Sequence, residues 1–522
     1  MSAANHPDHA TLVARVAQLE AQLAMAHAEI KRKDQIIAGL QHRLFGSSSE
    51  KLDPAQLQLK FDELVMGKPA PAGGAVPTPV KAKAARNRRT KAELFPKNLK
   101  IVIDKVLLPD GVDPDSAEWK ELDPDFHDEL DSTKPEVFWR RVVMRKFVRT
   151  DDKSLPPVTA PAPLPSIPGT LCAPALAAQI ITDKFEDHLP HYRQSMRFRR
   201  RQGVILGRQT LNAWTHATVD HLRPLGPAMK AEVLQATDLQ VDETPIDYLK
   251  PGHGATKSGY LWIYNDPIGR NCYYDWQLGR GHECMLDFLG FDEQTNTILF
   301  AGDIQCDGHS AYPALAARFM NIRLAGCLAH IRRKFVEVGD MAPEITLPIL
   351  RFIQEIYFIE DQTRLTGAPP ACRELIRRSR SRPITDQLYR FMIGHRSAHL
   401  PHDKLGEALT YAINQWNKFL VCLENGRLEI DNNLAENKVR PAKLGAKNWM
   451  FFGNAEAGVN NALLYTIMAN CRNHGLDPEM YLTEVIKRLP HNATPEQAAE
   501  LTPARFAAVL AAAAHSEAAA VA

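Results

Sequence analysis

Carboxylates and amides gather in residues 427–440, which read Arg-Leu-Glu-Ile-Asp-Asn-Asn-Leu-Ala-Glu-Asn-Lys-Val-Arg. The segment follows Gly426, a residue type that commonly ends helices. Asn432 or Asn433 suits the N-cap of a new helix, because a short amide side chain can satisfy free backbone N–H groups. Glu436 then lies about one helical turn from the cap. The pattern therefore predicts a carboxylate held on the first turn of a helix.

Two further acids follow strand-like sequences upstream. Asp242 stands in Leu-Gln-Val-Asp-Glu-Thr, and Asp307 stands in Ile-Gln-Cys-Asp-Gly. Mg²⁺ prefers oxygen ligands, and two such ions can activate an attacking oxygen and stabilise a leaving one at phosphorus. Asp242, Asp307 and Glu436 are therefore predicted to bind two Mg²⁺ ions, for which Mn²⁺ is expected to substitute, and to catalyse phosphoryl transfer.

Each acid also has a purely structural interpretation. Asp242 and Glu243 point to opposite faces of a strand, so one of them is a candidate surface charge. Asp307-Gly308 is a common turn dipeptide. Glu436 follows the second asparagine by three residues, the spacing of a capping box. The functional interpretation is favoured because the order of the acids and the types of element agree.

The third acid has two competitors nearby, Glu429 and Asp431. Both precede the asparagine cap, where we expect their directions to be poorly fixed. Glu436 lies within the helix, and Leu434 is predicted to pack beneath it and set its direction. A catalytic ligand needs such rigidity, so Glu436 is the predicted ligand.

Cys327 and His330 have the spacing of half a zinc site, but no second pair lies nearby in sequence, which makes zinc the less favoured interpretation. The basic run beside them is a more plausible contact for phosphate, and a second group of cations with an aromatic ring follows the third acid. Both groups are predicted to contact DNA: Arg332, Arg333, Lys334, Arg440, Lys447 and Trp449.

A helix–glycine–helix pattern lies before the first acid. Residues 193–208 contain six arginines and no acid, and Gly203 marks a turn between two helical stretches. This is typical of a helix-turn-helix motif, although a charged helical connector is the alternative. The predicted DNA-contacting residues are Arg199, Arg200, Arg201, Arg208, Gln209 and Asn212.

The acids must be positioned by the elements between residues 229 and 490. Short runs rich in β-branched and aromatic residues, including Val137-Phe-Trp139 further upstream, predict strands. From residue 237 the order is three hairpin-like strands and then strand–helix–strand units, typical of a ribonuclease-H-like α/β core. Apolar stripes at helical spacing after residue 349 predict a helical insertion in that core.

The length of 522 residues suggests several domains, while the net charge of +2 gives no global argument for nucleic acid. Eight scattered cysteines without a CxxC pair argue against a disulfide framework. No apolar run is long enough to span a membrane, so we expect a cytoplasmic, nucleoid-associated protein. Apolar residues in 9–45 alternate at spacings of three and four, which predicts self-association through a coiled coil, with packing on the chain itself as the alternative.

The predicted domains follow from these patterns. They are a coiled coil (1–46), a basic flexible linker (47–95), a small β-rich module (96–165), a helix-turn-helix-like DNA-binding region (166–228), the first part of the core (229–328), the helical insertion (329–426), the second part of the core with the third acid (427–490) and an Ala-rich tail (491–522).

Motifs over nearly the whole chain resemble the large transposases of bacterial insertion-sequence family sixty-six. They include His42-Arg-Leu-Phe-Gly-Ser, Asp187-His-Leu-Pro-His-Tyr-Arg193, Val241-Asp-Glu-Thr244, Asp307-Gly-His-Ser-Ala-Tyr312, Gly326-Cys-Leu-Ala-His-Ile-Arg-Arg-Lys-Phe335, Glu429-Ile-Asp-Asn-Asn-Leu-Ala-Glu436, Lys447-Asn-Trp-Met-Phe451 and Asn473-His-Gly-Leu-Asp-Pro-Glu-Met-Tyr-Leu482.

The resemblance implies a DDE transposase with Mg²⁺, a ribonuclease-H-like core and Asp242, Asp307 and Glu436 as its triad. It also implies action on the inverted terminal repeats of an element, on target DNA, and possible accessory proteins of the same element. Residues 96–165 contain no cysteine, unlike the zinc module of many relatives, and Gly445-Ala-Lys lacks their usual arginine. The alternative function is a catalytically inactive, transposase-derived DNA-binding protein or repressor.

Overall fold

The computed structural model describes residues 136–142, 146–147, 158–159, 163–250, 252, 254–339, 341–400 and 402–521. All of them belong to one compact unit of the chain, 128–522. The predicted coiled coil (9–45) and basic linker (47–95) lie outside the described residues, as does most of the predicted β-rich module. Of that module, β1 (Lys146–Phe147) pairs antiparallel with β2 (Val158–Thr159). Residues 136–142 have no regular secondary structure, so the strand predicted at Val137-Phe-Trp139 is wrong.

Helices precede the central sheet. They are α4 (Pro174–Phe185), α5 (His191–Gln202), α6 (Arg208–Leu222) and α7 (Leu225–Leu234). Gly203 ends α5 with a φ of 70°, a left-handed conformation that glycine adopts without the steric cost of a Cβ atom. The predicted glycine turn between two helices is therefore confirmed.

The central sheet has five strands: β3 (Asp238–Leu249), β4 (Thr256–Asn265), β5 (Cys272–Gln277), β8 (Gly302–Gln305) and β9 (Ile322–Ala325). Their order is β5-β4-β3-β8-β9. The first three strands run antiparallel to one another, and β8 and β9 extend the sheet in parallel from β3. Between β5 and β9 lie α8 (Glu283–Leu286), β6 (Phe291–Asp292), β7 (Thr297–Ile298) and α9 (Ala311–Arg318). The predicted strand at Thr297 thus forms a separate hairpin with β6.

Side chains of the sheet alternate between two cores. Leu261 and Ile263 of β4 belong to a core that includes α16, whereas Trp262 and Tyr264 belong to a core that includes α9. Successive residues of a strand point to opposite faces, so one strand contributes to both layers. Burying each such large side chain contributes about 1.5–3 kcal/mol. The predicted α/β fold class is confirmed.

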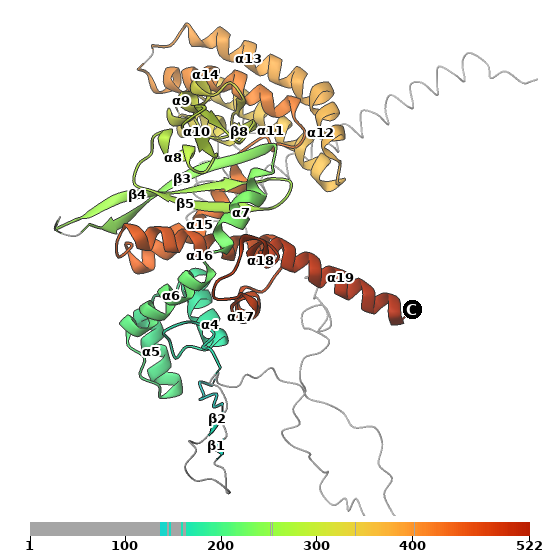
Figure 1. Cartoon of the computed structure of the whole chain (residues 1–522). Coiled ribbons are helices and arrows are strands. Elements are labelled where there is room, and N and C mark those ends of the chain that lie inside the picture. The colour runs from blue at the N-terminus through green and yellow to red at the C-terminus, as the bar shows by residue number, and fades with distance from the viewer. Residues whose placement is uncertain are drawn as a thin grey trace, which may run out of the picture. The chain divides into compact units, whose positions relative to one another are not determined.

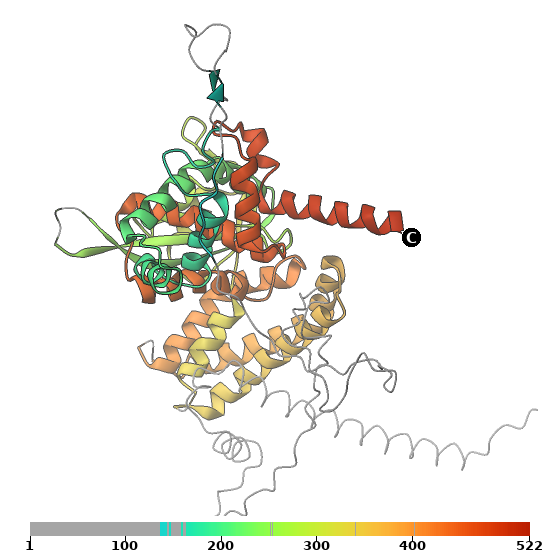
Figure 2. The same cartoon turned by 90° about the horizontal axis from the view of Figure 1, so that it is seen from below.

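A block of helices separates β9 from the last part of the chain. Its elements are α10 (Leu328–Glu337), α11 (Pro343–Leu365), α12 (Pro370–Ile376), the π-helix η1 (Arg377–Ser381), α13 (Arg382–Arg396) and α14 (Lys404–Glu424). Ile349, Ile353 and Ile356 of α11 are buried, as the apolar stripe predicted. Figures 1 and 2 show α11–α14 on the opposite side of the sheet from α4–α6.

The C-terminal helices return to the sheet. They are α15 (Asn433–Trp449), α16 (Ala455–Asn473), α17 (Pro478–Arg488), α18 (Pro495–Ala499) and α19 (Pro503–Val521). In Figure 1, α15 and α16 lie along one face of the sheet, while α8 and α9 lie toward the other face. Among the described residues, no helix combines the length and apolar character that crossing a bilayer requires.

Candidate active site

Asp242 lies on β3, and Asp307 lies two residues beyond the end of the neighbouring strand β8. The parallel register of β3 and β8 pairs Gln240 with Gln305, and each aspartate follows its glutamine by two residues. The two glutamine side chains are on one face, where Gln240 Nε2 donates to Gln305 Oε1 at 2.7 Å. Because side chains two residues apart share a face, the two aspartates are directed to the same side of the sheet.

Buried amides attach the segment before α15 to these strands. Gln240 Nε2 donates to the carbonyl of Asp431 at 3.1 Å, and Gln305 Nε2 donates to the carbonyl of Glu429 at 2.7 Å. Asn432 Nδ2 donates to the carbonyl of Val241 at 3.0 Å, one residue before Asp242. These bonds place the first turn of α15 beside the middle of β3.

The predicted helix cap needs correction. Asn432 occupies the N-cap position, but its side chain makes no capping hydrogen bond because it is bound to β3. Asp431 takes over part of this role, since its Oδ1 accepts from the backbone N–H of Asn433 at 3.1 Å. The sequence pattern thus located the helix start correctly and assigned the cap to the wrong side chain.

Leu434 does not pack beneath Glu436 as predicted. Its side chain is 41% exposed, and the buried face of α15 is formed by Ala435, Val439 and Ala442. The direction of Glu436 therefore comes from Ala435 and from the anchored segment before the helix, while Leu434 points outward.

We call Asp242, Asp307 and Glu436 the acid cluster. Burial, followed by the charges of Glu243, Glu436 and Asp307, raises the pKa of Asp242 to about 8. Asp307 Oδ1 accepts the backbone N–H of His309 at 2.9 Å. Like charges at one partly buried place disfavour simultaneous ionisation, and a divalent cation removes that repulsion.

The cluster is more open than a single-ion site. Within the described residues, the potential ligand atoms of its three acids do not all lie within 4.8 Å of one another. A two-metal site holds its ions about 3.5–4 Å apart, so its carboxylates need not be in mutual contact. The donor set, three partly buried carboxylates, fits Mg²⁺ or Mn²⁺.

Other acids near the cluster are committed to protein partners. Glu243 is not a surface charge, because its Oε1 accepts from Arg280 Nε at 2.6 Å and its Oε2 accepts from the hydroxyl of Tyr312 at 2.6 Å. Its side chain is only 1% exposed. Arg280 and Tyr312 therefore hold the Glu243 carboxylate on the face of β3 opposite to that of Asp242.

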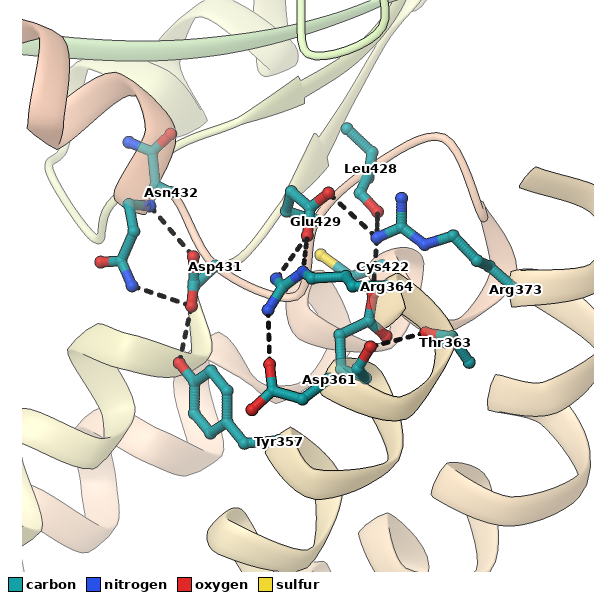
Figure 3. A network of polar contacts seen from close by, with 12 residues as sticks. Tyr357, Asp361, Thr363, Arg364, Arg373, Cys422, Leu428, Glu429, Asp431 and Asn432 are labelled. Atoms are coloured by element: carbon teal, nitrogen blue, oxygen red, sulfur yellow. Dashed lines mark hydrogen bonds and ion pairs between the residues drawn. The ribbon is translucent and has the colours of Figure 1, made fainter. Parts of the chain in front are cut away.

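Glu429 and Asp431 are also fixed, contrary to the prediction that their directions would be loose (Figure 3). Glu429 Oε2 lies 2.5 Å from Arg364, and its Oε1 lies 3.0 Å from Arg373. Asp431 Oδ2 accepts the hydroxyl of Tyr357 at 2.9 Å. Burial raises the pKa of Asp431, and the hydrogen bond from Tyr357 partly opposes that effect.

The same arginines bind a deeper acid. Glu360 is 1% exposed and is held by Arg373 and by Arg377, whose side chain is completely buried. Burial favours a higher pKa for Glu360, but the hydrogen bonds and charges of Arg377 and Arg373 lower it overall. We call Glu360, Glu429, Arg364, Arg373 and Arg377 the arginine–carboxylate network. It joins the helical block to the segment that leads into α15.

The helical block also reaches the acid cluster directly. A Cβ atom on Gly308 would lie 2.8 Å from the ring of Tyr411 and 3.2 Å from Gln415 Nε2, both on α14. Gly308 therefore allows α14 to approach the loop after Asp307. Burial and the charge of Asp307 raise the pKa of Tyr411 to about 12. No local sequence pattern indicated Tyr411, because it is brought to Asp307 by tertiary packing.

The predicted DNA-contacting residues of the first helical region lie at the surface. Arg199, Arg200 and Arg201 end α5, and Arg208, Gln209 and Asn212 begin α6; all six are exposed. Two other arginines of the stretch are engaged, since Arg197 pairs with Asp183 and Arg193 donates to Asn448 at 3.4 Å. In the part of the chain that the structure describes, no ion pair is formed by Arg199, Arg200, Arg201 or Arg208.

The second set of predicted contacts is more varied. Arg333 and Lys334 of α10 are exposed, as are Arg440 and Lys447 of α15, whereas Arg332 is half-buried. Arg333 lies 3.3 Å from Glu436 Oε2. Trp449 is half-buried and stacks on Phe452 with ring centroids 4.9 Å apart, beside a cavity of about 370 Å³ that Asn212 also lines. Its ring therefore packs within the fold at the edge of that cavity, and its contact with DNA stays a prediction.

Two family models match the sequence of this chain. A family model described as "Transposase IS66 family" matches residues 169–460, more than half of the chain and all three members of the acid cluster. A second model, described as "Transposase C of IS166 homeodomain", matches residues 34–103, which lie outside the described residues.

Three relatives from Sinorhizobium fredii are similar in sequence. "Uncharacterized protein y4jD" is 31% identical over 349 residues, which cover 64% of this chain and 66% of that protein. "Uncharacterized protein y4qI" is 29% identical over 541 residues, covering 97% and 94%. "Uncharacterized protein y4hP" is 26% identical over 495 residues, covering 87% and 85%. The similarity thus extends well beyond the acid cluster.

Proposed function

The chain belongs to the IS66 family of transposases, and from this premise we propose that it is a metal-dependent enzyme that cuts and joins DNA strands at the inverted terminal repeats of an insertion sequence. The observation that carries the proposal is the contrast among the acids of one region. Asp242, Asp307 and Glu436 come together from β3, the loop after β8 and α15, and among them Glu436 pairs with Arg333 at 3.3 Å. Glu243, Glu429 and Asp431 are instead held by shorter contacts to protein partners, at 2.5–2.9 Å.

The strand order supports a finer proposal about the core. Three antiparallel strands followed by two parallel ones, with helices on both faces, is the order expected of a ribonuclease-H-like core. The helical block then stands as an insertion between the second and third acids.

The acid cluster would hold the metal ions. Mg²⁺, when bound, supplies Lewis-acid activation of the attacking oxygen and charge stabilisation of the leaving oxygen at a DNA phosphate. The protein's part is positional: the β3–β8 register sets the two aspartates, and the anchored segment before α15 sets Glu436. Gly308 allows Tyr411 and Gln415 of α14 to approach the loop that carries Asp307.

DNA would be held by exposed cations on several elements. The last turn of α5 presents Arg199, Arg200 and Arg201, and α6 presents Gln209 and Asn212, side chains suited to phosphates and base edges. Exposed cations also lie on α15, the helix that carries Glu436, and on α10, whose Arg333 pairs with Glu436; they would meet phosphates near the cut. Self-association through residues 9–45, accessory proteins of the same element and a nucleoid-associated location belong to the same proposal.

Asp307→Asn tests the proposal. The amide keeps the shape of the side chain but removes the charge that binds a cation, and a loss of several kcal/mol corresponds to about a thousandfold in rate. We expect Mg²⁺-dependent nicking of a terminal-repeat duplex to disappear, while a gel shift with the same duplex stays within about threefold of the parent. Asp247→Asn, on the exposed end of β3, is the control and should cleave normally. If Asp307→Asn cleaves as well as the parent, Asp307 has no role in catalysis, and if neither cleaves, the inactive DNA-binding alternative is favoured.

A further inference from the structure

Two helix N-termini meet on the flank of the acid cluster. Cys327 is the N-cap residue of α10, and the backbone N–H of Leu328 donates to the carbonyl of Ile430 at 3.0 Å. The backbone N–H of Asn432, at the start of α15, donates to Cys327 Sγ at 3.2 Å. Burial and the charge of Asp431 raise the pKa of the Cys327 thiol, and the hydrogen bond from the N–H of Asn432 partly opposes that effect. A bound divalent ion would stabilise the thiolate.

Three potential metal ligands face one another at this junction. Cys327 Sγ, a ring nitrogen of His330 and a carboxylate oxygen of Glu436 all lie within 4.8 Å of one another, the only such group of three or more His, Cys, Asp or Glu residues in the described part of the chain. His330 Nδ1 and Glu436 Oε1 are 3.6 Å apart. His330 is on the first turn of α10 and Glu436 is on the first turn of α15, so two rigid elements set their spacing.

Two of these atoms have unmet hydrogen-bonding capacity. His330 Nδ1 and Glu436 Oε1 are both buried and have no hydrogen-bond partner. Buried polar atoms without partners are rare in folded proteins, and a missing ion is one explanation. The other carboxylate oxygen of Glu436 is directed to Arg333, which leaves Oε1 for His330 and Cys327.

The donor types select a class of ion. A sulfur, an imidazole nitrogen and a single carboxylate oxygen suit Zn²⁺, whereas Mg²⁺ takes oxygen ligands. Tetrahedral Zn²⁺ binds these ligands at about 2.0–2.3 Å, so ligand atoms within 4.8 Å need only small side-chain adjustments. Three protein ligands leave a fourth position for water or a DNA phosphate.

We propose that Cys327, His330 and Glu436 form a binding site for one thiophilic divalent ion of the Zn²⁺ class, and that this ion withdraws Glu436 from the acid cluster. The withdrawal of Glu436 rests on the proposed function, since it affects activity only if Glu436 takes part in Mg²⁺-dependent cleavage. Cys327 binds as the thiolate and releases its proton to solvent. Zn²⁺ then inhibits the enzyme by occupying Glu436 Oε1, without displacing Asp242 or Asp307.

The site is tested directly with Co²⁺, a spectroscopic substitute for Zn²⁺, added to the metal-free full-length chain. A thiolate bound to Co²⁺ gives a sulfur-to-metal charge-transfer absorption, and we expect it to saturate at one equivalent. Cys327→Ser should abolish that absorption. Cys422→Ser is the matched control, because Cys422 is also buried and its Sγ lies 3.2 Å from the carbonyl of Gly326, which a serine hydroxyl can reach.

His330→Asn provides a second test if Cys327→Ser does not fold. His330 is on the partly exposed side of the site, and loss of a ligand should weaken Co²⁺ binding at least tenfold, since even supporting residues cost ten- to a hundredfold. Charge-transfer absorption that persists in Cys327→Ser, or His330→Asn that binds Co²⁺ as tightly as the parent, overturns the site.

Inhibition by Zn²⁺ is tested with the parent protein at a constant Mg²⁺ concentration. One equivalent of Zn²⁺ should lower nicking of the terminal-repeat duplex at least tenfold, and a chelator selective for Zn²⁺ should restore it. If nicking is undiminished when Zn²⁺ fills the site, the proposed inhibition is wrong. A parent that never cleaves counts against the proposed function, while the Co²⁺ absorption still decides whether the site exists.

Discussion

The arginine–carboxylate network and the acid cluster each take one acid from residues 429–436, Glu429 and Glu436 respectively, and the partners of the two groups differ. In the arginine–carboxylate network, Glu360 and Glu429 contact Arg364, Arg373 and Arg377 at distances up to 3.0 Å. In the acid cluster, burial and then the charges of neighbouring carboxylates raise the pKa of Asp242. Glu436, another member of the cluster, forms an ion pair with Arg333 at 3.3 Å.

The difference separates structural acids from candidate catalytic ones. A buried carboxylate with a guanidinium partner stabilises the packing of two elements, and removing either charge leaves the other unpaired. A group of carboxylates that mainly repel one another is instead a place where a cation binds favourably. The partners of an acid therefore say more about its role than its position in a motif.

Loss of Glu360 should have the largest effect on stability. Glu360→Gln leaves the fully buried Arg377 without its counter-charge, and we expect a loss of about 3–5 kcal/mol in the free energy of unfolding. Urea denaturation of the full chain measures it. Glu374→Gln is the control, because Arg378 is exposed and Glu374 is only half-buried, so loss of this ion pair should change stability by less than about 1 kcal/mol. Equal effects of the two substitutions would remove the distinction between buried and exposed pairs.

The acid cluster should respond in the opposite way. In metal-free buffer, Asp242→Asn should be at least as stable as the parent, because burial and neighbouring carboxylates raise the pKa of Asp242 and so disfavour its charged form in the fold. Mg²⁺ at a hundred times its Kd should stabilise the parent by about 3 kcal/mol and the variant by much less. Thermal unfolding with and without Mg²⁺ measures both effects, with Asp247→Asn as the control that keeps the parent's response. A full Mg²⁺ response in Asp242→Asn would place the cation elsewhere.

Glu429→Gln should have the smallest effect of the three. Arg373 keeps its contact with Glu360, and Arg364 keeps its contact with Asp361, so neither cation is left unpaired. We expect a loss of about 1 kcal/mol or less in stability and cleavage within about threefold of the parent. A loss of cleavage on the scale of Asp307→Asn would move Glu429 into the acid cluster.

Local patterns in the sequence predicted much of the fold. The β-branched runs at Leu239, Tyr260 and Cys272 became β3, β4 and β5, because alternating burial on two faces is encoded in each strand. The apolar residues from Ile349 to Ile359 lie in α11, because their spacing places them on one buried face of a helix. The run at Thr297 has a composition like that of the central strands, but it pairs with β6 outside the central sheet. Composition alone does not determine the pairing partner of a strand.

The candidate site was less predictable because long-range contacts decide it. The order of the three acids could be recognised from sequence, but the partners of Glu243, Glu429 and Asp431 lie tens of residues away. Asn432 has the composition of a cap, yet tertiary packing uses its amide to bind Val241. Leu434 and Ala435 are adjacent apolar residues, and the rotation of α15 on the sheet determined which one is buried.

The central claim is that Glu436, and not its neighbour Asp431, completes the acid cluster. Cleavage of a terminal-repeat duplex by Glu436→Gln and Asp431→Asn, with the melting temperature of each compared with the parent, tests this most directly. We predict that folded Glu436→Gln loses cleavage by at least about a hundredfold. Asp431→Asn should be intermediate, because its amide weakens the contacts with Tyr357 and Asn433 that position α15. A folded Glu436→Gln that still cleaves, beside an Asp431→Asn that does not, would contradict the assignment.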